Sequence, residues 1–272
     1  MLSDIQLESF NNNGFLVIED FIDNNKCQLL INRAKQLIDG FDPSSHRTIF
    51  TTNEQERNSD KYFIDSANKV SFFFEQGAID KNNNFSVPKQ QSINKIGHAQ
   101  HLLDPIYKSV IDGLSLDSIS KQLGIAMPRA IQSMHIFKQP KIGGEVGLHQ
   151  DSTFLYTEPL SCIGFWFALE DASIDNGCLQ AIPGGHKTGL KKRFYMATDN
   201  EIKFEVLDSS EYPEDELEML EVKAGTMIIL HGQLPHYSDS NKSDRSRQAL
   251  SVHIVDGQCH YPKDNWLQSE LV

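Results

Sequence analysis

Residues 162–185 read CIGFWFALEDASIDNGCLQAIPGG, and this stretch indicates the fold class. It contains two short apolar runs, 162–169 and 178–182, with the turn-forming pair Asn176-Gly177 between them and Pro183-Gly184-Gly185 after them. Apolar runs of this length that end at glycine and proline are typical of buried β-strands. The segment therefore predicts two strands from the interior of a β-rich protein.

The same pattern continues through most of the C-terminal half of the chain. From Ala130 onward there are further strand-like runs, separated by turns such as Ala224-Gly225, at residues 131–137, 203–207, 219–222, 226–230 and 248–255. Many short strands with glycine- and proline-containing turns predict an all-β sandwich or barrel. We expect a jelly-roll core within a single domain that spans residues 1–272.

The N-terminal part is predicted to be more helical. Ser3 and Gln6 form a capping-box pattern that opens a short helix ending before Gly14, and apolar residues at helical spacing predict a second helix over residues 24–40. Further helices are expected between residues 97 and 124, strands at 15–18, 62–64 and 70–74, and a loop at 80–86. The expected architecture is mainly β, with helices that flank the jelly-roll core.

The composition argues against several classes of protein. The chain has 272 residues, of which 39% are hydrophobic and 23% charged, so disorder is not expected. A formal net charge of −12 without a basic stripe argues against nucleic-acid binding. No stretch approaches about 18 apolar residues, the length of a membrane span. Four scattered cysteines without a C-x-x-C pair, together with the lack of a targeting signal, predict a cytoplasmic protein.

His149 and Asp151 are the first candidate metal ligands. They stand two residues apart in Gly147-Leu148-His149-Gln150-Asp151, and on a β-strand such residues point to the same face. An imidazole and a carboxylate could then bind one divalent cation. With a second histidine they would match the ligand set of non-haem Fe(II) oxygenases, which leaves positions open for cosubstrate and oxygen. A His-x-Asp pair also occurs by chance in surface loops, so a third ligand is needed.

Two downstream histidines compete for the role of third ligand. His236 lies two residues before Ser238, which would share its face, and Arg247 opens the next predicted strand. His231 follows the apolar run 226–230 and could serve either as a ligand or in hydrogen bonds within the turn. His186 lies in a glycine turn and is expected to have a role in that turn. Spacing favours His236 and leaves His231 open.

An arginine near the third ligand could bind an anionic cosubstrate. Strand alternation places Arg247, Ala249 and Ser251 on one face, where the two small residues leave room for a pocket. A guanidinium can hold a dicarboxylate through a two-pronged, charge-assisted pair. Arg245 is the alternative, because residues 244–247 could instead form an exposed turn. Trp166 is expected in the core or in the wall of the pocket.

These motifs resemble those of the phytanoyl-CoA dioxygenase family of 2-oxoglutarate-dependent oxygenases. The resemblance is carried by His149-Gln150-Asp151, by residues 176–179 and 182–187, and by His236 and Arg247, and it runs nearly end to end. It implies a double-stranded β-helix, which is the cupin-like form of the jelly roll. It also implies the iron ligands His149, Asp151 and His236, and a 2-oxoglutarate site formed by Lys95, Met134, Trp166, Ser238 and Arg247.

The resemblance implies a reaction as well. An Fe(II)- and 2-oxoglutarate-dependent dioxygenase, an oxidoreductase, would use O2 to hydroxylate a small-molecule substrate and release succinate and CO2, with ascorbate as a candidate reductant. Asp151 favours hydroxylation, because a halogenase of this type would lack the carboxylate. The alternatives are a non-catalytic jelly-roll module that binds 2-oxoglutarate and metal as a sensor, and a cupin-type metalloenzyme independent of 2-oxoglutarate. The substrate stays open, since the fold and cofactor site serve many substrates.

Overall fold

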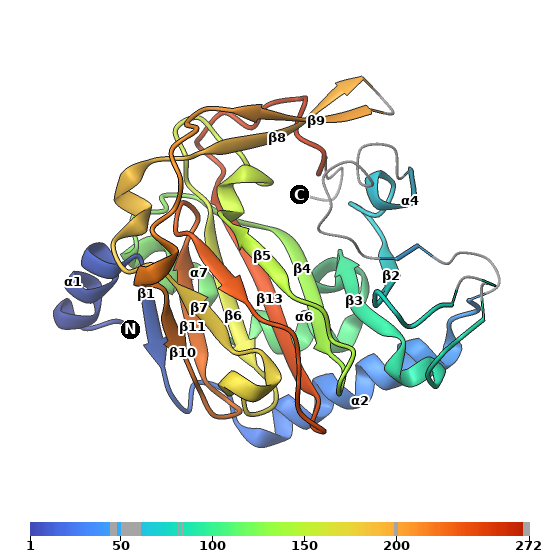
Figure 1. Cartoon of the computed structure of the whole chain (residues 1–272). Helices are drawn as coiled ribbons and strands as arrows, with labels where there is room; N and C mark the ends of the chain where they lie inside the picture. Colours follow the sequence, from blue (N-terminus) through green and yellow to red (C-terminus); the bar gives the residue numbers. More distant parts are fainter. Residues whose placement is uncertain (44–47, 50–60, 81, 83, 199–200, 269–272) are drawn as a thin grey trace.

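Two antiparallel β-sheets dominate the computed structural model, which describes residues 1–43, 48–49, 61–80, 82, 84–198 and 201–268 (Figure 1). Within these residues the larger sheet has seven strands in the order β1-β11-β6-β13-β4-β3-β2, and the smaller sheet has four in the order β10-β7-β12-β5. Strands β8 and β9 form a separate hairpin at one end of the sheets (Figure 1).

Consecutive strands alternate between the two sheets from β4 to β7 and again from β10 to β13. This alternation, with the two sheets face to face, is the double-stranded β-helix that the sequence predicted. The strands of the larger sheet are β1 (Phe15–Ile18), β2 (Val70–Phe74), β3 (Ile93–His98), β4 (Pro128–Lys138), β6 (Ile163–Ala168), β11 (Met227–His231) and β13 (Arg247–Asp256). Those of the smaller sheet are β5 (Val146–His149), β7 (Leu179–Ala181), β10 (Glu218–Leu220) and β12 (His236–Ser238), and the hairpin is β8 (Lys192–Thr198) with β9 (Glu201–Val206).

Helix α1 begins and ends with the caps that the sequence predicted. The Ser3 side chain accepts a hydrogen bond from the Gln6 N–H, the Gln6 side chain accepts one from the Ser3 N–H, and Gly14 ends the helix with a φ of 80°. The helices are α1 (Asp4–Asn13), α2 (Asn24–Gly40), α4 (Lys61–Ile64), α5 (Gln100–Leu103), α6 (Pro105–Asp112) and α7 (Leu116–Gln122). Short 3-10 turns are η1 (Lys89–Gln91), η2 (Asp151–Thr153), η3 (Ile174–Asn176), η4 (Gly185–Thr188) and η5 (Glu214–Glu216). None of the helices in the described ranges is long and apolar enough to span a membrane.

The two faces of the larger sheet have different partners. Phe165 of β6 and Leu250 of β13 belong to a buried cluster that also includes side chains of α2, α6 and α7, so the helices cover the outer face. Trp166 and Ala249 face the other way and pack with Leu179 of the smaller sheet. The predicted alternation along β13 is therefore confirmed, and it leaves an interior between the two sheets in which side chains from both can meet.

Two local predictions were wrong, and strands β3 and β8 were not predicted. Residues 62–64 form part of helix α4 instead of a strand, and the Asp65 N–H donates to the Lys61 carbonyl at 2.9 Å. A run of three apolar residues is too short for periodicity to separate the two states, and the stacking of Phe63 on Trp266 belongs to the tertiary structure. Residues 97–98 belong to β3 instead of a helix. In the predicted loop 80–86, residues 81 and 83 lie outside the described residues.

Phe165 provides a test of the outer cluster, because its side chain is fully buried beneath the helices. We predict that Phe165→Ala lowers the free energy of unfolding by about 3–5 kcal/mol, since truncation removes buried aromatic surface and leaves a cavity. Leu29→Ala, at a position of α2 that is 45% exposed, is the control and should change it by at most about 0.5 kcal/mol. Denaturant titration measures both variants. Equal losses would show that this cluster does not stabilise the fold preferentially.

Candidate metal centre and its cavity

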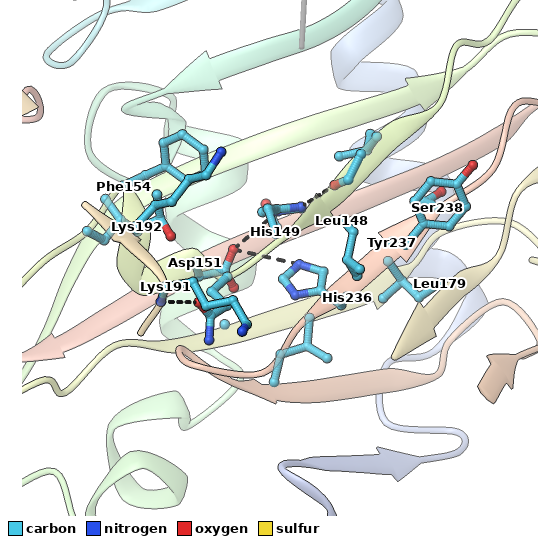
Figure 2. Close-up of a pocket in the computed structure, with 18 of the residues that line it drawn as sticks. Leu148, His149, Asp151, Phe154, Leu179, Lys191, Lys192, His236, Tyr237 and Ser238 are labelled. Carbon is cyan, nitrogen blue, oxygen red and sulfur yellow. Dashed lines mark hydrogen bonds and ion pairs between the residues drawn. The ribbon is translucent and has the colours of Figure 1, made fainter. Parts of the chain in front are cut away.

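A cavity of about 990 Å³ lies between the two sheets and is lined by residues of both. The smaller sheet contributes side chains of β5, β7 and β12, and the larger sheet contributes side chains of β3, β4, β6 and β13. Lys192 and Phe204 of the β8–β9 hairpin, together with residues between 206 and 215, also line it. Figure 2 shows part of this lining around His149 and His236.

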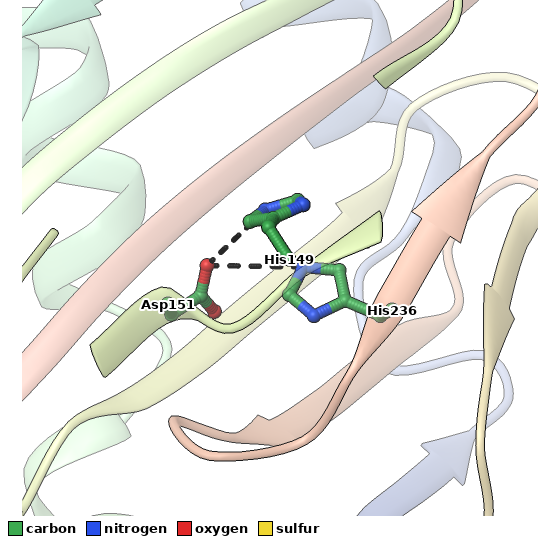
Figure 3. Close-up of side chains that lie close together, drawn as sticks. All are labelled: His149, Asp151 and His236. Atoms are coloured by element: carbon green, nitrogen blue, oxygen red, sulfur yellow. Dashed lines mark ion pairs between the residues drawn. The ribbon is translucent and has the colours of Figure 1, made fainter. Parts of the chain in front are cut away.

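His149 and His236 face each other from neighbouring strands (Figure 3). β12 pairs antiparallel with β5, His236 stands directly opposite His149, and the ring centroids are 4.2 Å apart. The Nδ1 atom of His149 lies 2.8 Å from the carbonyl oxygen of Gly147, and that of His236 lies 3.0 Å from the carbonyl oxygen of Leu234. A carbonyl oxygen only accepts, so each Nδ1 carries a proton, and each Nε2 presents a lone pair when the ring is neutral. Both rings are thereby oriented as metal ligands would be.

Asp151 lies beside the two rings, although not from the strand that the sequence predicted. β5 ends at His149, and Asp151 begins the 3-10 turn η2. Gln150 keeps an extended backbone, with φ −120° and ψ 133°, so the side chains on either side of it still project the same way. Asp151 Oδ1 lies 3.8 Å from His149 Nε2 and 3.7 Å from His236 Nε2. The three ligand atoms lie within 4.8 Å of one another, an arrangement that could hold a divalent cation.

Burial and the neighbouring imidazoles act in opposite directions on Asp151. Burial raises the pKa of its carboxyl group, but His253, His236 and His149 outweigh this effect and hold the pKa well below its usual value of 3.8. Asp151 is therefore an anion at neutral pH. A cation that binds here meets an ionised oxygen and releases no proton from this residue.

Gln150 is fully buried and ties the ligand motif to the rest of the molecule. Its amide nitrogen donates to the carbonyl oxygens of Gly189 at 2.8 Å and Gln233 at 2.7 Å. Its oxygen accepts from the Lys191 N–H at 2.9 Å and the Tyr212 hydroxyl at 3.0 Å. One side chain thus links the end of β5 to the turn before β12 and to Lys191 and Tyr212, which line the mouth of the cavity. No local pattern could have identified this residue, because its partners are far away in the sequence.

The competing histidines lie outside the lining of the cavity. His231 Nδ1 accepts a hydrogen bond from the Gln233 N–H at 3.1 Å, and its ring packs 4.9 Å from that of His186 and 6.1 Å from that of Phe10. Burial, and secondarily His186, lowers the pKa of His231 to about 4. His231 and His186 therefore pack between the turn and α1, and the structure places His236 beside Asp151 instead.

Arg247 lies at the start of β13 and is buried. Its Nη2 donates to Ser238 Oγ at 3.3 Å, and its Cζ lies 5.5 Å from the ring centroid of Trp166. Among the residues that the structure describes, Arg247 Nε and Nη1 have no hydrogen-bond partner. Burial lowers the pKa of Arg247 to about 10, although Cys178 and Glu170 oppose it, so the guanidinium stays charged at neutral pH. A buried cation with unused donors is suited to bind an anionic group.

The other residues predicted for the cosubstrate lie in the same cavity. Lys95 Nζ lies 4.0 Å from Met134 Sδ, and it lies 5.5 Å and 5.1 Å from the ring centroids of Phe63 and Phe73. Arg245, the alternative to Arg247, is exposed on the turn before β13 and is not among the residues that line this cavity. The structure thus brings all the predicted site residues, which are Lys95, Met134, His149, Asp151, Trp166, His236, Ser238 and Arg247, to one cavity.

Two buried groups beside the site were not predicted. His253 Nε2 lies 3.3 Å from Asp151 Oδ2. Lys138 stands opposite Arg247 in the pairing of β4 with β13, and burial, then the charge of Arg247, lowers its pKa to about 7. Extending the alternation along β13 by one step, from residue 251 to 253, could have identified His253. The position of Lys138 opposite Arg247 follows from the register between β4 and β13, and no local sequence pattern gives that register.

Comparison with known proteins finds relatives that match nearly the whole chain. A family model described as phytanoyl-CoA dioxygenase (PhyH) matches residues 10–249. Phytanoyl-CoA dioxygenase of Arabidopsis thaliana is 47% identical over 264 residues, which cover 97% of this chain and 92% of that protein. Phytanoyl-CoA dioxygenase domain-containing protein 1 of Bos taurus is 42% identical over 276 residues, which cover 98% and 95%. Both relatives thus match almost the whole chain.

Solved structures share the fold at low sequence identity. The non-haem α-ketoglutarate-dependent carbocyclase SnoK from nogalamycin biosynthesis superposes with a TM-score of 0.67 at 17% identity, covering 97% of this chain and 87% of that one. EctD from S. alaskensis, solved with 2-oxoglutarate and 5-hydroxyectoine, superposes with a TM-score of 0.65 at 17% identity, covering 99% and 80%. These similarities confirm the double-stranded β-helix.

We predict that the chain binds one divalent cation between His149, Asp151 and His236. His149→Ala and His236→Ala should each abolish binding, because each removes one of the ligands. Anaerobic calorimetric titration with Fe(II) or Co(II) measures this directly. His231→Ala and His186→Ala are the controls and should bind like the wild type. Loss of binding in His231→Ala, with binding retained in His236→Ala, would show that the third ligand is misassigned.

Proposed function

This chain belongs to the phytanoyl-CoA dioxygenase family, and on that premise we propose that it is an Fe(II)- and 2-oxoglutarate-dependent dioxygenase that hydroxylates a small molecule and releases succinate and CO2. The observation that carries the proposal is the convergence, in one cavity, of the His149, Asp151 and His236 cluster with the buried guanidinium of Arg247. A cytoplasmic location, predicted from the cysteine pattern, belongs to the same proposal.

The donor set suits iron. Asp151 offers an ionised oxygen, and His149 and His236 offer Nε2 atoms whose rings are oriented through Nδ1. When bound, the iron would activate O2, which is the oxidant of the reaction. The contribution of the chain is to hold these three ligands on β5, η2 and β12 while the facing sheet supplies the groups that bind the organic molecules.

The cosubstrate site in this proposal is centred on Arg247. Among the described residues its Nε and Nη1 have no partner, and either of them forms a two-pronged fork with the neighbouring Nη2, which suits the distal carboxylate of 2-oxoglutarate. Ser238 holds Nη2, and Trp166 packs beside the guanidinium, so the fork is already oriented. Lys95 and Met134 complete the wall on the same sheet, and the ammonium of Lys95 adds positive charge that suits a dianion.

Aromatic side chains at the cavity border limit access of water. Phe154 lies 5.3 Å from Phe194 and 6.3 Å from Phe204, measured between ring centroids, and Phe194 is fully buried. A drier cavity strengthens the charge-assisted contacts of cosubstrate and metal, and it protects an oxidising centre from side reactions. The hairpin therefore serves this function as a partial cover.

We predict that Arg247 determines the affinity for 2-oxoglutarate. Removing one member of a buried charge pair typically costs about 3–5 kcal/mol, and about 1.4 kcal/mol corresponds to a tenfold change. Arg247→Ala should therefore weaken 2-oxoglutarate binding by roughly a hundredfold or more. Arg247→Lys should recover part of the loss, since lysine lacks the planar fork. Titration of 2-oxoglutarate into the Co(II)-loaded variants measures the effect.

Arg245→Ala is the matched control, because Arg245 is an exposed arginine on the same turn. It should bind 2-oxoglutarate like the wild type. Metal binding should survive all of these changes, because neither arginine is a ligand. A large loss of 2-oxoglutarate affinity in Arg245→Ala, with little loss in Arg247→Ala, would contradict the assignment.

The charge at the cavity mouth bears on the choice of substrate. Lys191 is paired with Asp208 at 3.4 Å and donates to the Ser210 carbonyl at 2.7 Å, so its charge is already partnered. The acidic residues in this part of the lining are Asp208, Glu211, Glu214 and Asp215, against the lysines Lys191 and Lys192. A net acidic mouth repels a polyanion such as a CoA thioester at low ionic strength.

A turnover screen tests the activity and the substrate class together. We expect slow formation of succinate without substrate, because uncoupled turnover needs only iron, oxygen and cosubstrate. Acyl-CoAs, free carboxylic acids and amino-acid derivatives are then compared for stimulation. If an acyl-CoA stimulates, its effect should grow with ionic strength as salt screens the acidic mouth, whereas an uncharged substrate should show no such dependence.

His149→Ala provides the background rate for this screen. An iron-loaded protein that binds 2-oxoglutarate but forms no succinate under any condition would contradict the enzymatic proposal and favour a binding module. In this reaction succinate is formed from 2-oxoglutarate. Oxidation of a substrate when 2-oxoglutarate is absent would therefore favour a cupin-type metalloenzyme that is independent of 2-oxoglutarate.

A further inference from the structure

The two oxygens of Asp151 have different neighbours. Oδ1 faces the Nε2 atoms of His149 and His236, at 3.8 Å and 3.7 Å. Oδ2 faces His253 of β13, whose Nε2 lies 3.3 Å away. His253 comes from the larger sheet and is buried, with 5% of its surface exposed. One carboxylate oxygen is thus directed to the candidate ligand set, and the other to an imidazole outside it.

The surrounding backbone leaves room for this contact. Gly164 of β6 stands opposite His253 in the sheet, and a Cβ at Gly164 would lie 2.8 Å from Asp151 Oδ2 and 3.4 Å from Cδ2 of His253. A side chain at residue 164 would therefore force the Asp151 carboxylate to shift and would fill the space beside the imidazole. The register of β13 with β4 also shifts directly after His253, at Ile254, and such irregularities re-aim side chains next to active sites.

The contact to Asp151 is a close polar contact of 3.3 Å through His253 Nε2, and within the described residues Asp151 Oδ2 has no hydrogen-bond partner. A carboxylate oxygen only accepts, so an attractive contact requires a proton on Nε2. The Nδ1 atom of His253 is buried and, within the part of the chain that the structure describes, has no hydrogen-bond partner. The ring is therefore held by its contact with Asp151 and by packing.

We propose that His253 is a positioning residue of the metal centre: its Nε2–H holds Asp151 Oδ2, so that Oδ1 alone is presented to the cation. This inference rests on the proposed role of Asp151 as an iron ligand. Ligation through one oxygen would leave room beside the cation for the keto acid group of 2-oxoglutarate and for O2. A carboxylate that is free to bind through both oxygens would compete for the position that O2 needs.

Metal affinity and the visible spectrum of the Co(II)-loaded full chain test this role without turnover. His253→Phe removes the donor and keeps a ring, and it should weaken Co(II) binding by about 10- to 100-fold and change the spectrum. His253→Gln keeps an N–H at similar reach and should restore most of the affinity and the wild-type spectrum. His231→Phe is the matched control, because His231 is a histidine outside the cavity lining, and it should leave both readouts unchanged.

Gly164→Ala disturbs the same contact while leaving His253 in place, and it should also weaken Co(II) binding. Wild-type affinity and spectrum in His253→Phe would overturn the proposal. So would a loss that His253→Gln does not restore, because packing would then explain it. If His253→Phe does not fold, wild-type behaviour of His253→Gln together with weakened binding by Gly164→Ala supports the proposal, and any other pattern overturns it. A wild-type chain that binds no metal contradicts the proposed function itself, whereas equal binding by the wild type and the His253 variants contradicts only the positioning role.

Discussion

The pairing of β12 with β5 is the contact on which the candidate metal centre depends. It places His236 opposite His149, and on its other edge β12 pairs with β7, where His236 stands opposite the fully buried Ala181. A slip of one residue would turn every side chain of β12 to the other face of the sheet. Because each ring is also held by a carbonyl oxygen two residues earlier in its own chain segment, the backbone sets the separation and the direction of both nitrogen atoms. Flexible side chains contribute little to this geometry, which is what a preorganised ligand set requires.

Charged groups of opposite sign lie in different parts of the site. Asp151 is surrounded by imidazoles, which offset the cost of burying its charge and keep it ionised. Arg247 and Lys138 stand opposite each other on the paired strands β13 and β4, and burial lowers the pKa of both. The cation–π contact with Trp166 and the hydrogen bond to Ser238 do not use all of the Arg247 donors. A buried guanidinium with unused donors is costly to the isolated chain, and an anionic ligand would remove that cost. The same feature that lowers stability therefore favours binding.

Local patterns accounted for most of the fold and for part of the site. Strands such as β6 and β13 could be predicted because their alternation and glycine turns are local, whereas β8 and α4 depend on packing against distant aromatic residues. The spacing of His149 and Asp151 predicted correctly that their side chains project the same way, although the two residues do not share a strand. The strand ends at His149, and the extended backbone of Gln150 maintains the alternation as far as Asp151. The choices between His236 and His231, and between Arg247 and Arg245, depend on strand register and so remained open. Gln150 and His253 were missed because each acts through partners from other strands or turns.

The division between inner and outer elements explains how one such scaffold can serve different substrates. The candidate ligands and the cosubstrate residues lie on strands of the two sheets or beside them, where register and core packing oppose change. The mouth is bordered by β8, β9 and residues 206–215, most of which lie outside both sheets and can vary without moving the ligands. The separation is incomplete, because Gln150 accepts a hydrogen bond from Tyr212 at the mouth and donates to Gln233 in the turn before β12. A molecule that displaces Tyr212 would therefore change the hydrogen bonding of the residue between His149 and Asp151. Occupancy of the mouth is in this way physically connected to the position of the candidate ligands.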